Sequence, residues 1–566
     1  MLPLKKIFIA FKERIIYDKK TKEKKMQIKT VQTTPFQDQK MGTSGLRKKT
    51  KVFLENKNYL ENFIQAIFNV IDVKGKRLVL GGDGRYFNKE AIQIILKMAI
   101  SSNAKEILLG INGYLSTPAL SFEVRNNHFD GGIILTASHN PGGMNGDFGV
   151  KFNGSNGAPA PENLTTAFTE ESKKISAFQT IEMPDIALDK EGVQIFENTT
   201  IRVVDAVKDY ADFMETIFDF DVIRALFKKG FTMHYDAFNA VTGPYAKEIF
   251  ENRLGASAGS VVNAEPLPDF GGRHPDPNLT YAKDLVCLMY SENSPDFGAA
   301  ADGDGDRYMV LGKSFFVTPA DSVAILADNA GLVKGYQGDI SGVARSMPTA
   351  TPLDRVAKAH GWDLYEVPTG WKFFGSLLDA GRILFCGEES FSASSSHIRE
   401  KDGIWALLFW LTILAKTGKS VEQIVHEHWQ KYGRSYAVRY DFENLTVQKA
   451  DEVMENLRQK LPTLTGQNFA DTIIEKADEF TYTDPVNGAV SAHQGIRIFL
   501  QNGSRIVFRI SGTGTQGATI RLYLEKYEKN DFSKKATEAV QDLADNAIKL
   551  ASLKQIAGID TPSVIT

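Results

Sequence analysis

The sequence predicts an α/β protein made of three related α/β domains followed by an α+β domain. Its 566 residues are too many for one hydrophobic core. Three segments share one order, an apolar strand, a polar turn and an amphipathic helix, which is typical of βαβ units in a mainly parallel sheet. After about residue 420, alternating strands are mixed with helices instead, and this change predicts a separate α+β domain.

The first domain is predicted over residues 26–207. Residues 76–85 form an apolar stretch that ends in a Gly-rich turn, and the helix after it places Ala91, Ile95 and Met98 on one face together with Ile94. The elements expected in order are a strand at 27–36, a strand at 76–85 with a helix at 88–104, a strand at 106–113 with a helix starting in 115–127, and a strand ending at Leu135.

The same order of elements returns twice, at residues 231–256 and at residues 340–362. The repeats have diverged too far to be called a sequence repeat. The later domains are therefore predicted at 208–325, 326–425 and 426–566.

Composition matches an ordinary globular protein, with 43% hydrophobic and 24% charged residues. The net charge of −3 gives no electrostatic reason to expect a nucleic-acid partner. The two cysteines, Cys287 and Cys386, lie far apart without CxxC spacing, so we expect reduced thiols and a cytoplasmic protein. No apolar run approaches the roughly 18 to 20 residues that span a bilayer, so no transmembrane segment is expected.

Residues 1–25 form a basic leader with nine basic and three acidic side chains. Lys5 and Lys6 interrupt its apolar residues, which argues against a signal peptide. We expect a disordered segment upstream of a natural start at Met26. A basic helix lying on a membrane surface is the alternative.

Ser138 lies in the sequence TASHNP, where an apolar strand runs out into a loop. Open α/β sheets carry their site residues at such strand ends. A serine hydroxyl becomes a useful nucleophile only when a base or a metal activates it, and the candidate neighbours are His139, Lys151 and an aspartate cluster near residue 304. The alternative is that Ser138 and Asn140 are ordinary turn formers.

That aspartate cluster consists of Asp302, Asp304 and Asp306, with glycines between them. Three converging carboxylates repel one another unless a cation lies between them, and oxygen ligands suit a hard ion such as Mg²⁺. An EF-hand is excluded because its sixth position would be Arg307 and its twelfth Lys313. Arg307 adds positive charge that suits a phosphate beside the metal.

A GxGxxG pattern occurs within residues 509–517. The residues after it alternate as a strand and do not open a helix, so dinucleotide binding is not supported. Hydroxyls, loop amides and guanidinium groups there predict a phosphate cradle instead, formed by Arg509, Ser511, Thr513 and Arg521. In the same way Gly42, Ser44, Gly45 and Arg47 form a basic turn that could wrap an anion or be a plain surface turn.

Glu388 and Ser390 leave the end of another strand together and suit the hydroxyls of a sugar, although a solvated loop is the alternative. His397, Arg399 and Lys401 follow.

In this order, GTSGLRKK, GGDGR, TASHNPGG, DGDGDR, ARSMPT, VPTGWKFF, GEESF, HIREKDG and RISGTGTQGATIRLYLE closely resemble the motifs of phosphoglucomutases of the α-D-phosphohexomutase superfamily. The nearest branch is the eukaryotic and proteobacterial one that includes parafusin. The resemblance covers nearly everything from Met26 onward. It implies four domains around a central cleft, the first three of which are related α/β domains with mixed sheets.

The resemblance also implies roles for residues. Ser138 would carry a phosphoryl group, and its phosphate would join Asp302, Asp304 and Asp306 in binding one Mg²⁺ per chain. The catalytic residues would include Arg47, His139, Lys151 and Lys401. Substrate would be bound by Thr43, Ser44, Arg307, Thr369, Gly370, Glu388, Ser390, Lys401, Arg509, Ser511, Gly512, Thr513 and Arg521.

The implied activity is the reversible interconversion of α-D-glucose 1-phosphate and glucose 6-phosphate, with glucose 1,6-bisphosphate as intermediate and activator, by a cytoplasmic monomer or dimer. Two alternatives stay open: a related mutase that prefers phosphomannose, and a parafusin-like phosphoprotein with a non-catalytic role in membrane traffic. One residue departs from the branch. Ser396 replaces an Asp that usually precedes His397, and we expect this loss to weaken substrate capture.

Overall fold

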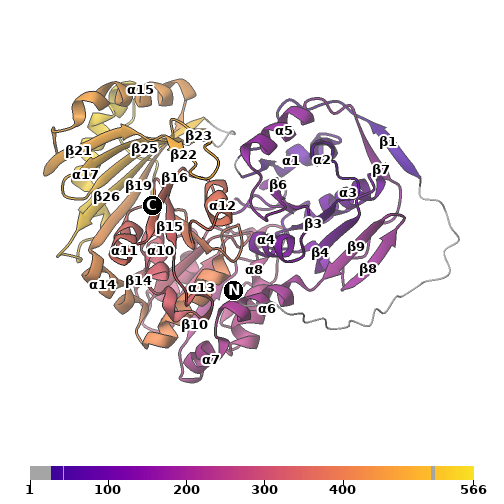
Figure 1. Ribbon diagram of the computed structural model, residues 1–566, viewed down its shortest axis with the longest axis horizontal. Coiled ribbons are helices and arrows are strands. Elements are labelled where there is room, and N and C mark those ends of the chain that lie inside the picture. The colour runs from indigo at the N-terminus through magenta and orange to yellow at the C-terminus, as the bar shows by residue number, and fades with distance from the viewer. Residues whose placement is uncertain (1–26, 43, 512–516) are drawn as a thin grey trace.

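A computed structural model describes residues 27–42, 44–511 and 517–566 (Figure 1). The predicted leader and the predicted site residues Thr43, Gly512 and Thr513 lie outside these residues. Four large sheets follow one another along the chain, and we number the corresponding domains 1 to 4. In Figure 1, domain 1 lies on the right, domain 4 at the upper left, and domains 2 and 3 below and between them.

Domain 1 is built on a seven-stranded sheet whose central strands are parallel and whose outer strands are antiparallel. The strand order is β2 (Leu46–Lys49), β6 (Asp147–Gly154), β5 (Gly131–Leu135), β3 (Arg77–Gly82), β4 (Glu106–Gly110), β9 (Thr199–Val204) and β8 (Gly192–Phe196). The helices are α1 (Thr50–Glu55), α2 (Tyr59–Ile71), α3 (Asn88–Ser101), α4 (Thr117–Asn126) and α5 (Glu162–Ser172), and β1 (Ile28–Gln32) pairs separately with β7 (Ala177–Ile181).

Strand β3 shows why this sheet is buried on both faces. Leu78 and Leu80 pack into the core that α2 and α3 cover, whereas Val79 points to the opposite side and joins the core shared with α4 and domain 2. Successive strand side chains alternate between faces, so an unbroken apolar run is what a strand covered on both sides requires.

Domain 2 contains the five-stranded sheet β11 (Val261–Val262), β10 (Met233–Asp236), β12 (Phe297–Ala301), β13 (Tyr308–Gly312) and β14 (Phe315–Phe316). Domain 3 contains the four-stranded sheet β16 (Asp363–Val367), β15 (Gly342–Ser346), β17 (Phe385–Glu388) and β18 (Ser392–Ser395). In both sheets three parallel strands are extended by antiparallel pairs. The mixed sheets that the resemblance implies are therefore confirmed. The parallel strands expected from the order of the elements are present, and hairpins add antiparallel strands at the edges.

The helices of domains 2 and 3 cover these sheets. They are α6 (Ala206–Ile217), α7 (Phe220–Lys228), α8 (Thr242–Ala246) with its π-helical continuation Lys247–Arg253, α9 (Lys283–Met289), α10 (Pro319–Asp328), α11 (Pro352–His360), α12 (Lys372–Asp379), α13 (Gly403–Thr417) and α14 (Val421–Tyr432). Short 3₁₀ turns occur at Ile111–Gly113, Phe270–Gly272, Ala330–Leu332 and Lys334–Tyr336.

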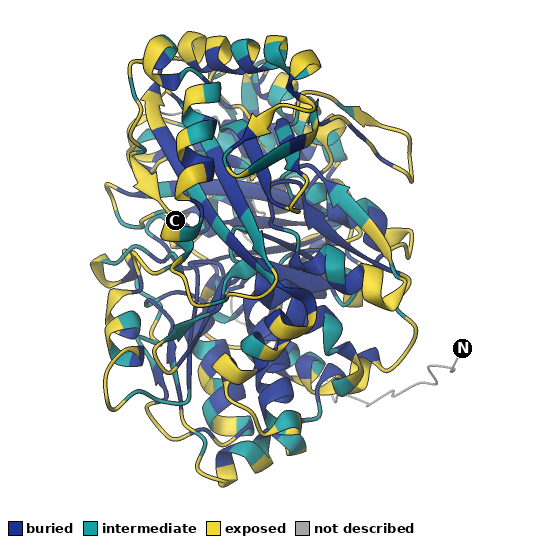
Figure 2. Cartoon of the chain, turned by 90° about the vertical axis from the view of Figure 1, so that its left-hand side faces the viewer, coloured by how far each residue is buried: buried dark blue, intermediate teal, exposed yellow. Residues whose placement is uncertain are grey.

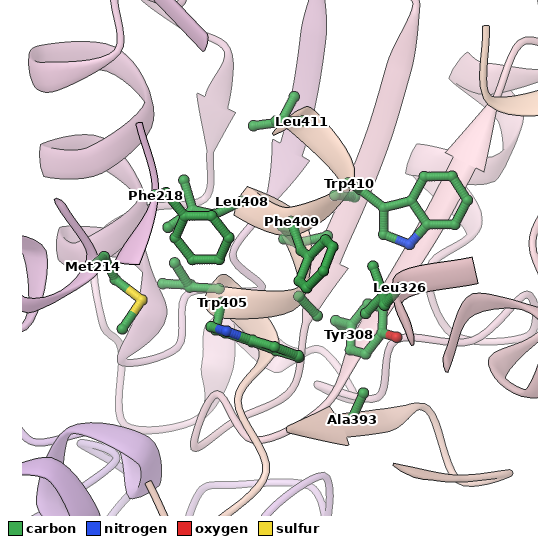
Figure 3. Packing of buried hydrophobic residues seen from close by; sticks show 14 of the residues in the cluster. Met214, Phe218, Tyr308, Leu326, Ala393, Trp405, Leu408, Phe409, Trp410 and Leu411 are labelled. Atoms are coloured by element: carbon green, nitrogen blue, oxygen red, sulfur yellow. The ribbon is translucent and has the colours of Figure 1, made fainter. Parts of the chain in front are cut away.

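Helix α13 is the shared core of domains 2 and 3. Trp405, Phe409 and Leu408 project from it toward Met214 and Phe218 of domain 2 and toward β13 and α10 (Figure 3). Its apolar residues surround the whole helix, which fits a helix buried on all sides. Among the described helices none alone is long and apolar enough to cross a membrane, while α13 and α14, which meet at 86°, reach that length and composition only together.

Domain 4 is an α+β unit built on an antiparallel sheet of seven strands. The order is β20 (Asn468–Phe469), β21 (Thr472–Glu479), β24 (Ile496–Leu500), β25 (Arg505–Ser511), β26 (Ala518–Glu528), β19 (Arg434–Leu445) and β27 (Val564–Ile565). Its other elements are α15 (Val447–Leu464), α16 (Ala536–Ala539), α17 (Gln541–Leu550), α18 (Leu553–Ala557) and the hairpin of β22 (Tyr482–Thr483) and β23 (Val490–Ser491). Figure 2 shows buried residues along the long strands and exposed residues on the outer faces of the helices.

The predicted domain boundaries after residues 207, 325 and 425 fall inside α6, α10 and α14. A helix is one hydrogen-bonded unit, so we propose that the chain divides at the ends of these helices: before Ala206, before Pro319 and after Tyr432.

Candidate functional site

Ser138 and the three aspartates meet where β5 of domain 1 and β12 of domain 2 end. The Ser138 hydroxyl donates a hydrogen bond of 2.7 Å to Asp302 Oδ2. Ser138 is 2% exposed and has a left-handed backbone, with φ at 53°, which is uncommon for a residue with a side chain. The two candidate motifs, 164 residues apart, therefore form one site.

The aspartates form a compact, buried group. One carboxylate oxygen from each of Asp302, Asp304 and Asp306 lies within 4.8 Å of the others. Asp304 Oδ1 and Asp306 Oδ1 are buried and find no hydrogen-bond partner among the described residues. Buried oxygens without a donor fit a hard divalent cation, so these residues could hold a metal ion.

Burial and the neighbouring charges act differently on the three carboxyl groups. Burial, followed by the charges of Asp304 and Asp306, raises the pKa of Asp302 well above its usual range. Burial would also raise the pKa of Asp304, but Lys151, a hydrogen bond from Thr117 and Lys401 lower it to about 2. A cation bound at Asp302 would stabilise the charged form that burial disfavours.

Two lysines lie near the group. Lys401, just before α13, lies 3.3 Å from Asp306 Oδ2. Lys151, on β6, lies 3.6 Å from Glu400 Oε1. Burial would lower the pKa of Lys151, but Glu400 and Asp304 raise it, so this ammonium group is held in its charged form.

The other predicted catalytic residues also lie at the site. His139 Nδ1 is 3.4 Å from Ser138 Oγ, and burial, followed by Arg307 and Arg47, holds the pKa of His139 well below its usual range. The histidine is therefore neutral at pH 7. The Arg307 backbone N–H donates to Asp302 Oδ1 at 3.0 Å. Arg47 follows the basic turn, whose Ser44 is exposed.

The predicted sugar loop follows β17. Glu388 is 4% exposed and accepts a hydrogen bond from the backbone N–H of Gly370 at 3.2 Å. The Thr369 hydroxyl is buried without a partner among the described residues, and Ser390 lies 3.5 Å from the hydroxyl of Ser392. The structure thus brings Thr369 and Gly370 of one loop beside Glu388 of the next.

The described part of the predicted phosphate cradle lies at the ends of β25 and β26. Arg509 and Arg521 are paired across these strands, and Ser511 ends β25. The strand predicted after the GxGxxG pattern is β26. Burial would lower the pKa of Arg521, but Tyr523 and Asp441 raise it.

Family models match nearly the whole chain. Three of them, described as phosphoglucomutase/phosphomannomutase alpha/beta/alpha domains I, II and III, match residues 38–179, 208–314 and 319–432. A fourth, described as the phosphoglucomutase-1 C-terminal domain, matches residues 434–563. The chain belongs to the phosphoglucomutase/phosphomannomutase family. Its four-domain α/β architecture is therefore that of the phosphohexomutases.

Relatives in this phosphoglucomutase family are close. A phosphoglucomutase of Rhizobium radiobacter is 53% identical, covering 95% of this chain and 100% of the relative. A chloroplastic phosphoglucomutase of Arabidopsis thaliana is 51% identical, with coverages of 96% and 89%. The crystal structure of the exocytosis-sensitive phosphoprotein pp63/parafusin, a phosphoglucomutase from Paramecium, has a TM-score of 0.89 and 46% identity, covering 95% of this chain and 99% of that one.

Sequence reasoning missed several residues at this phosphoglucomutase-family site. The Thr117 hydroxyl donates to Asp304 Oδ2 at 2.7 Å, although Thr117 was expected only near the start of a helix. Glu400 accepts from Asn153 Nδ2 at 3.0 Å beside Lys151, and its position next to Lys401 was the available signal. Asp276 lies 3.9 Å from Arg307, and no sequence pattern around it indicated that it belongs to the site.

The loop that contains Lys401 is held in place by side chains other than that of Ser396. His397 contacts Ser395 Oγ at 2.8 Å and Asp402 Oδ2 at 3.0 Å. Arg399 Nε donates to Asp379 at 2.5 Å. Ser396 takes part through its backbone, which accepts from Arg399 and donates to Leu384 O.

Proposed function

We propose that this chain interconverts α-D-glucose 1-phosphate and glucose 6-phosphate through a phosphorylated Ser138. The observation that supports this most is the Ser138 hydroxyl 2.7 Å from Asp302, within a buried group of three aspartates. Its relatives at about 50% identity are named phosphoglucomutases, and an isomerase of this kind needs a nucleophile, a charge-neutralising centre and two places for phosphate.

In this proposal Asp302, Asp304 and Asp306 hold one Mg²⁺, joined by an oxygen of the phosphate on Ser138. The ion would neutralise the negative charge that spreads over the phosphoryl oxygens during transfer. Arg307, whose guanidinium lies beside the cluster near Asp276, adds positive charge on the same side.

The reaction then proceeds in two transfers. The P–Oγ bond of phospho-Ser138 breaks as the O6 hydroxyl of glucose 1-phosphate bonds to phosphorus; the hydroxyl proton passes to a base of the site, and Ser138 Oγ takes up a proton. Glucose 1,6-bisphosphate results and turns end for end. Ser138 Oγ then gives up its proton and bonds to the phosphorus of the 1-phosphate, the P–O1 bond breaks, and glucose 6-phosphate leaves as O1 takes up a proton. Lys151 and Lys401, both near the aspartates, are the proposed proton carriers. Arg47 and His139 are the remaining proposed catalytic residues.

Substrate binding is assigned to both sides of the site. Glu388 and Ser390, with Thr369 and Gly370, would accept and orient sugar hydroxyls. Arg509, Ser511 and Arg521, together with Gly512 and Thr513, would hold the phosphate that does not react. Thr43 and Ser44 would contact the substrate as part of the catalytic surround. One cradle must serve either end of the sugar, because the intermediate reverses between the two transfers.

A coupled assay that follows glucose 6-phosphate formation from glucose 1-phosphate, with a trace of the bisphosphate, tests this proposal. Wild-type protein should turn over, and S138A should lose at least about a thousand-fold in kcat, since removing a nucleophile removes the covalent route. The matched control is S101A, since Ser101 is a buried serine at the end of α3 whose hydroxyl donates to Met98 O. Undiminished activity in S138A would contradict the mechanism.

The same reaction run with mannose 1-phosphate, followed as the formation of mannose 6-phosphate, separates the alternatives. Faster turnover of mannose 1-phosphate would make the chain a mutase of the phosphomannose kind. Absence of turnover on both sugars, from protein that is shown to be phosphorylated, would favour a non-catalytic phosphoprotein. Gel filtration and cell fractionation would test the proposed monomer or dimer and the cytoplasmic location.

A further inference from the structure

The turn that follows β3 lies against the backbone of Ser138. β3 and β5 are neighbouring parallel strands with Gly82 opposite Leu135, so the residues after each strand emerge side by side. Asp83 and Arg85 are 0% and 1% exposed. Their side chains form an ion pair in which Arg85 Nη2 lies 2.8 Å from Asp83 Oδ2, and the guanidinium covers the ring of Phe270 at 5.2 Å.

This ion pair holds the backbone of Ser138 on both sides. Arg85 Nη2 donates a hydrogen bond of 2.8 Å to the Ser138 carbonyl oxygen. The Ser138 N–H donates to Thr136 Oγ1 at 2.8 Å, and that hydroxyl donates to Asp83 Oδ2 at 2.6 Å. A second arm of Arg85 donates to Asp147 O at 2.8 Å, which anchors the far end of the same loop.

Ser138 needs such support because its left-handed backbone is unfavourable for serine and persists only where the surroundings hold it. The opposite side is closed by domain 2: a Cβ on Gly303 would lie 2.6 Å from the Ser138 carbonyl oxygen. The carbonyl oxygen is therefore fixed between Arg85 and Gly303, and this fixes the direction in which Oγ points toward Asp302.

We propose that Asp83 and Arg85 are positioning residues that hold Ser138 Oγ in line for phosphoryl transfer. The inference rests on the proposed function. Both side chains are buried and hold the Ser138 backbone, so they act through Ser138 and not on the substrate. The serine alternates between hydroxyl and phosphate during the reaction. The hydrogen bonds that hold its backbone keep one backbone geometry in both states.

The strand itself supplies a matched control at its other end. Arg77 begins β3, donates from Nε to Glu106 at 2.9 Å and from Nη1 to the backbone oxygen of Asn127 at 3.1 Å, and covers the ring of Phe129 at 4.2 Å. These are the same three kinds of contact that Arg85 makes, namely a carboxylate, a carbonyl oxygen and an aromatic ring. Only Arg85 directs its carbonyl contact to Ser138.

The experiment compares R85K with R77K. Lysine keeps the charge but cannot donate in several fixed directions at once. We expect kcat for glucose 1-phosphate to fall about 10- to 100-fold in R85K, since a small misplacement of a reacting group costs this much, while KM stays within about two-fold because substrate contacts are untouched. R77K should keep kcat within about two-fold of wild type. Equal losses in both variants, or an unchanged kcat in folded R85K, would overturn the inference.

A second pair of variants decides the matter if R85K does not fold. T136V removes the hydroxyl that links Asp83 to the Ser138 N–H and keeps its shape, and T136S restores a hydroxyl. We expect kcat to fall in T136V and to recover mostly in T136S. An unchanged kcat in T136V would contradict the proposed positioning role.

Amide hydrogen exchange gives a readout that needs no turnover. The peptide covering residues 136–140 should exchange faster in R85K and T136V than in R77K at matched global stability, because the Ser138 N–H loses its held acceptor. If wild-type protein turned over neither sugar phosphate, the proposed function would fail, while this comparison would still test whether Asp83 and Arg85 hold the Ser138 backbone. Equal exchange rates in all variants would overturn the inference that Asp83 and Arg85 hold the Ser138 backbone.

Discussion

At the scale of single residues, buried titratable groups outside the site determine how stability depends on pH. His428 on α14 is 5% exposed, and neither ring nitrogen finds a partner among the described residues. Burial, only partly opposed by the charge of Asp328, lowers the pKa of His428 to about 3. The unfolded chain takes up this proton below its ordinary pKa of 6.5, while the folded chain does not. Folding stability is therefore lost as the pH falls below 6.5.

We accordingly predict that H428L makes the protein less sensitive to acid. Between pH 7 and pH 5 the wild type should lose about 2 kcal/mol more of unfolding free energy than H428L does, measured as the change in the first urea transition at each pH. H426L is the control, since His426 lies on the same helix but is only half-buried. A pH dependence that is the same in wild type and H428L would contradict the assigned burial effect.

At the scale of elements, the loop between β18 and α13 shows how several contacts replace one missing carboxylate. The sequence predicted that Ser396 weakens this loop. In the structure His397, Arg399 and Lys401 are each held by a carboxylate, namely Asp402 of the same loop, Asp379 and Asp306. Asp402 also caps α13 through the Trp405 N–H and accepts from Tyr210 OH at 2.6 Å.

We therefore predict that S396D changes KM for glucose 1-phosphate by less than about two-fold. D402N should raise KM several-fold and lower stability by about 1.5 to 3 kcal/mol, because it removes charge-assisted hydrogen bonds in a buried position. Steady-state kinetics and urea unfolding of both variants test this. A several-fold fall in KM in S396D would restore the sequence-based expectation.

At the scale of the whole molecule, a metal ion bound at the aspartate cluster would couple metal binding to folding. A ligand that binds only the folded chain stabilises it by mass action, about 2.7 kcal/mol at a hundred times its Kd. We predict that millimolar Mg²⁺ raises the Tm of the wild type and that EDTA reverses this, with a smaller shift in D302N. NaCl at equal ionic strength is the control, and an equal shift with NaCl would show general screening and not a site.

The sequence by itself determined the class of the domains, the family and the residue types of the site. Local patterns record such features: the unbroken apolar residues of β3, the three aspartates at alternate positions, and the strand that follows the GxGxxG pattern. Each depends on neighbours a few residues away, so each could be predicted without knowing how the domains pack.

Only the tertiary structure decided through which atoms these residues meet and which unpredicted residues join them. Ser138 reaches Asp302, Thr117 reaches Asp304 and Glu400 reaches Lys151 across the boundaries between domains, and the register that places Asp83 behind Ser138 is set by the pairing of β3 with β5. These contacts arise from the packing of distant segments, which leaves no periodic trace in the sequence because each partner taken alone is an ordinary polar residue.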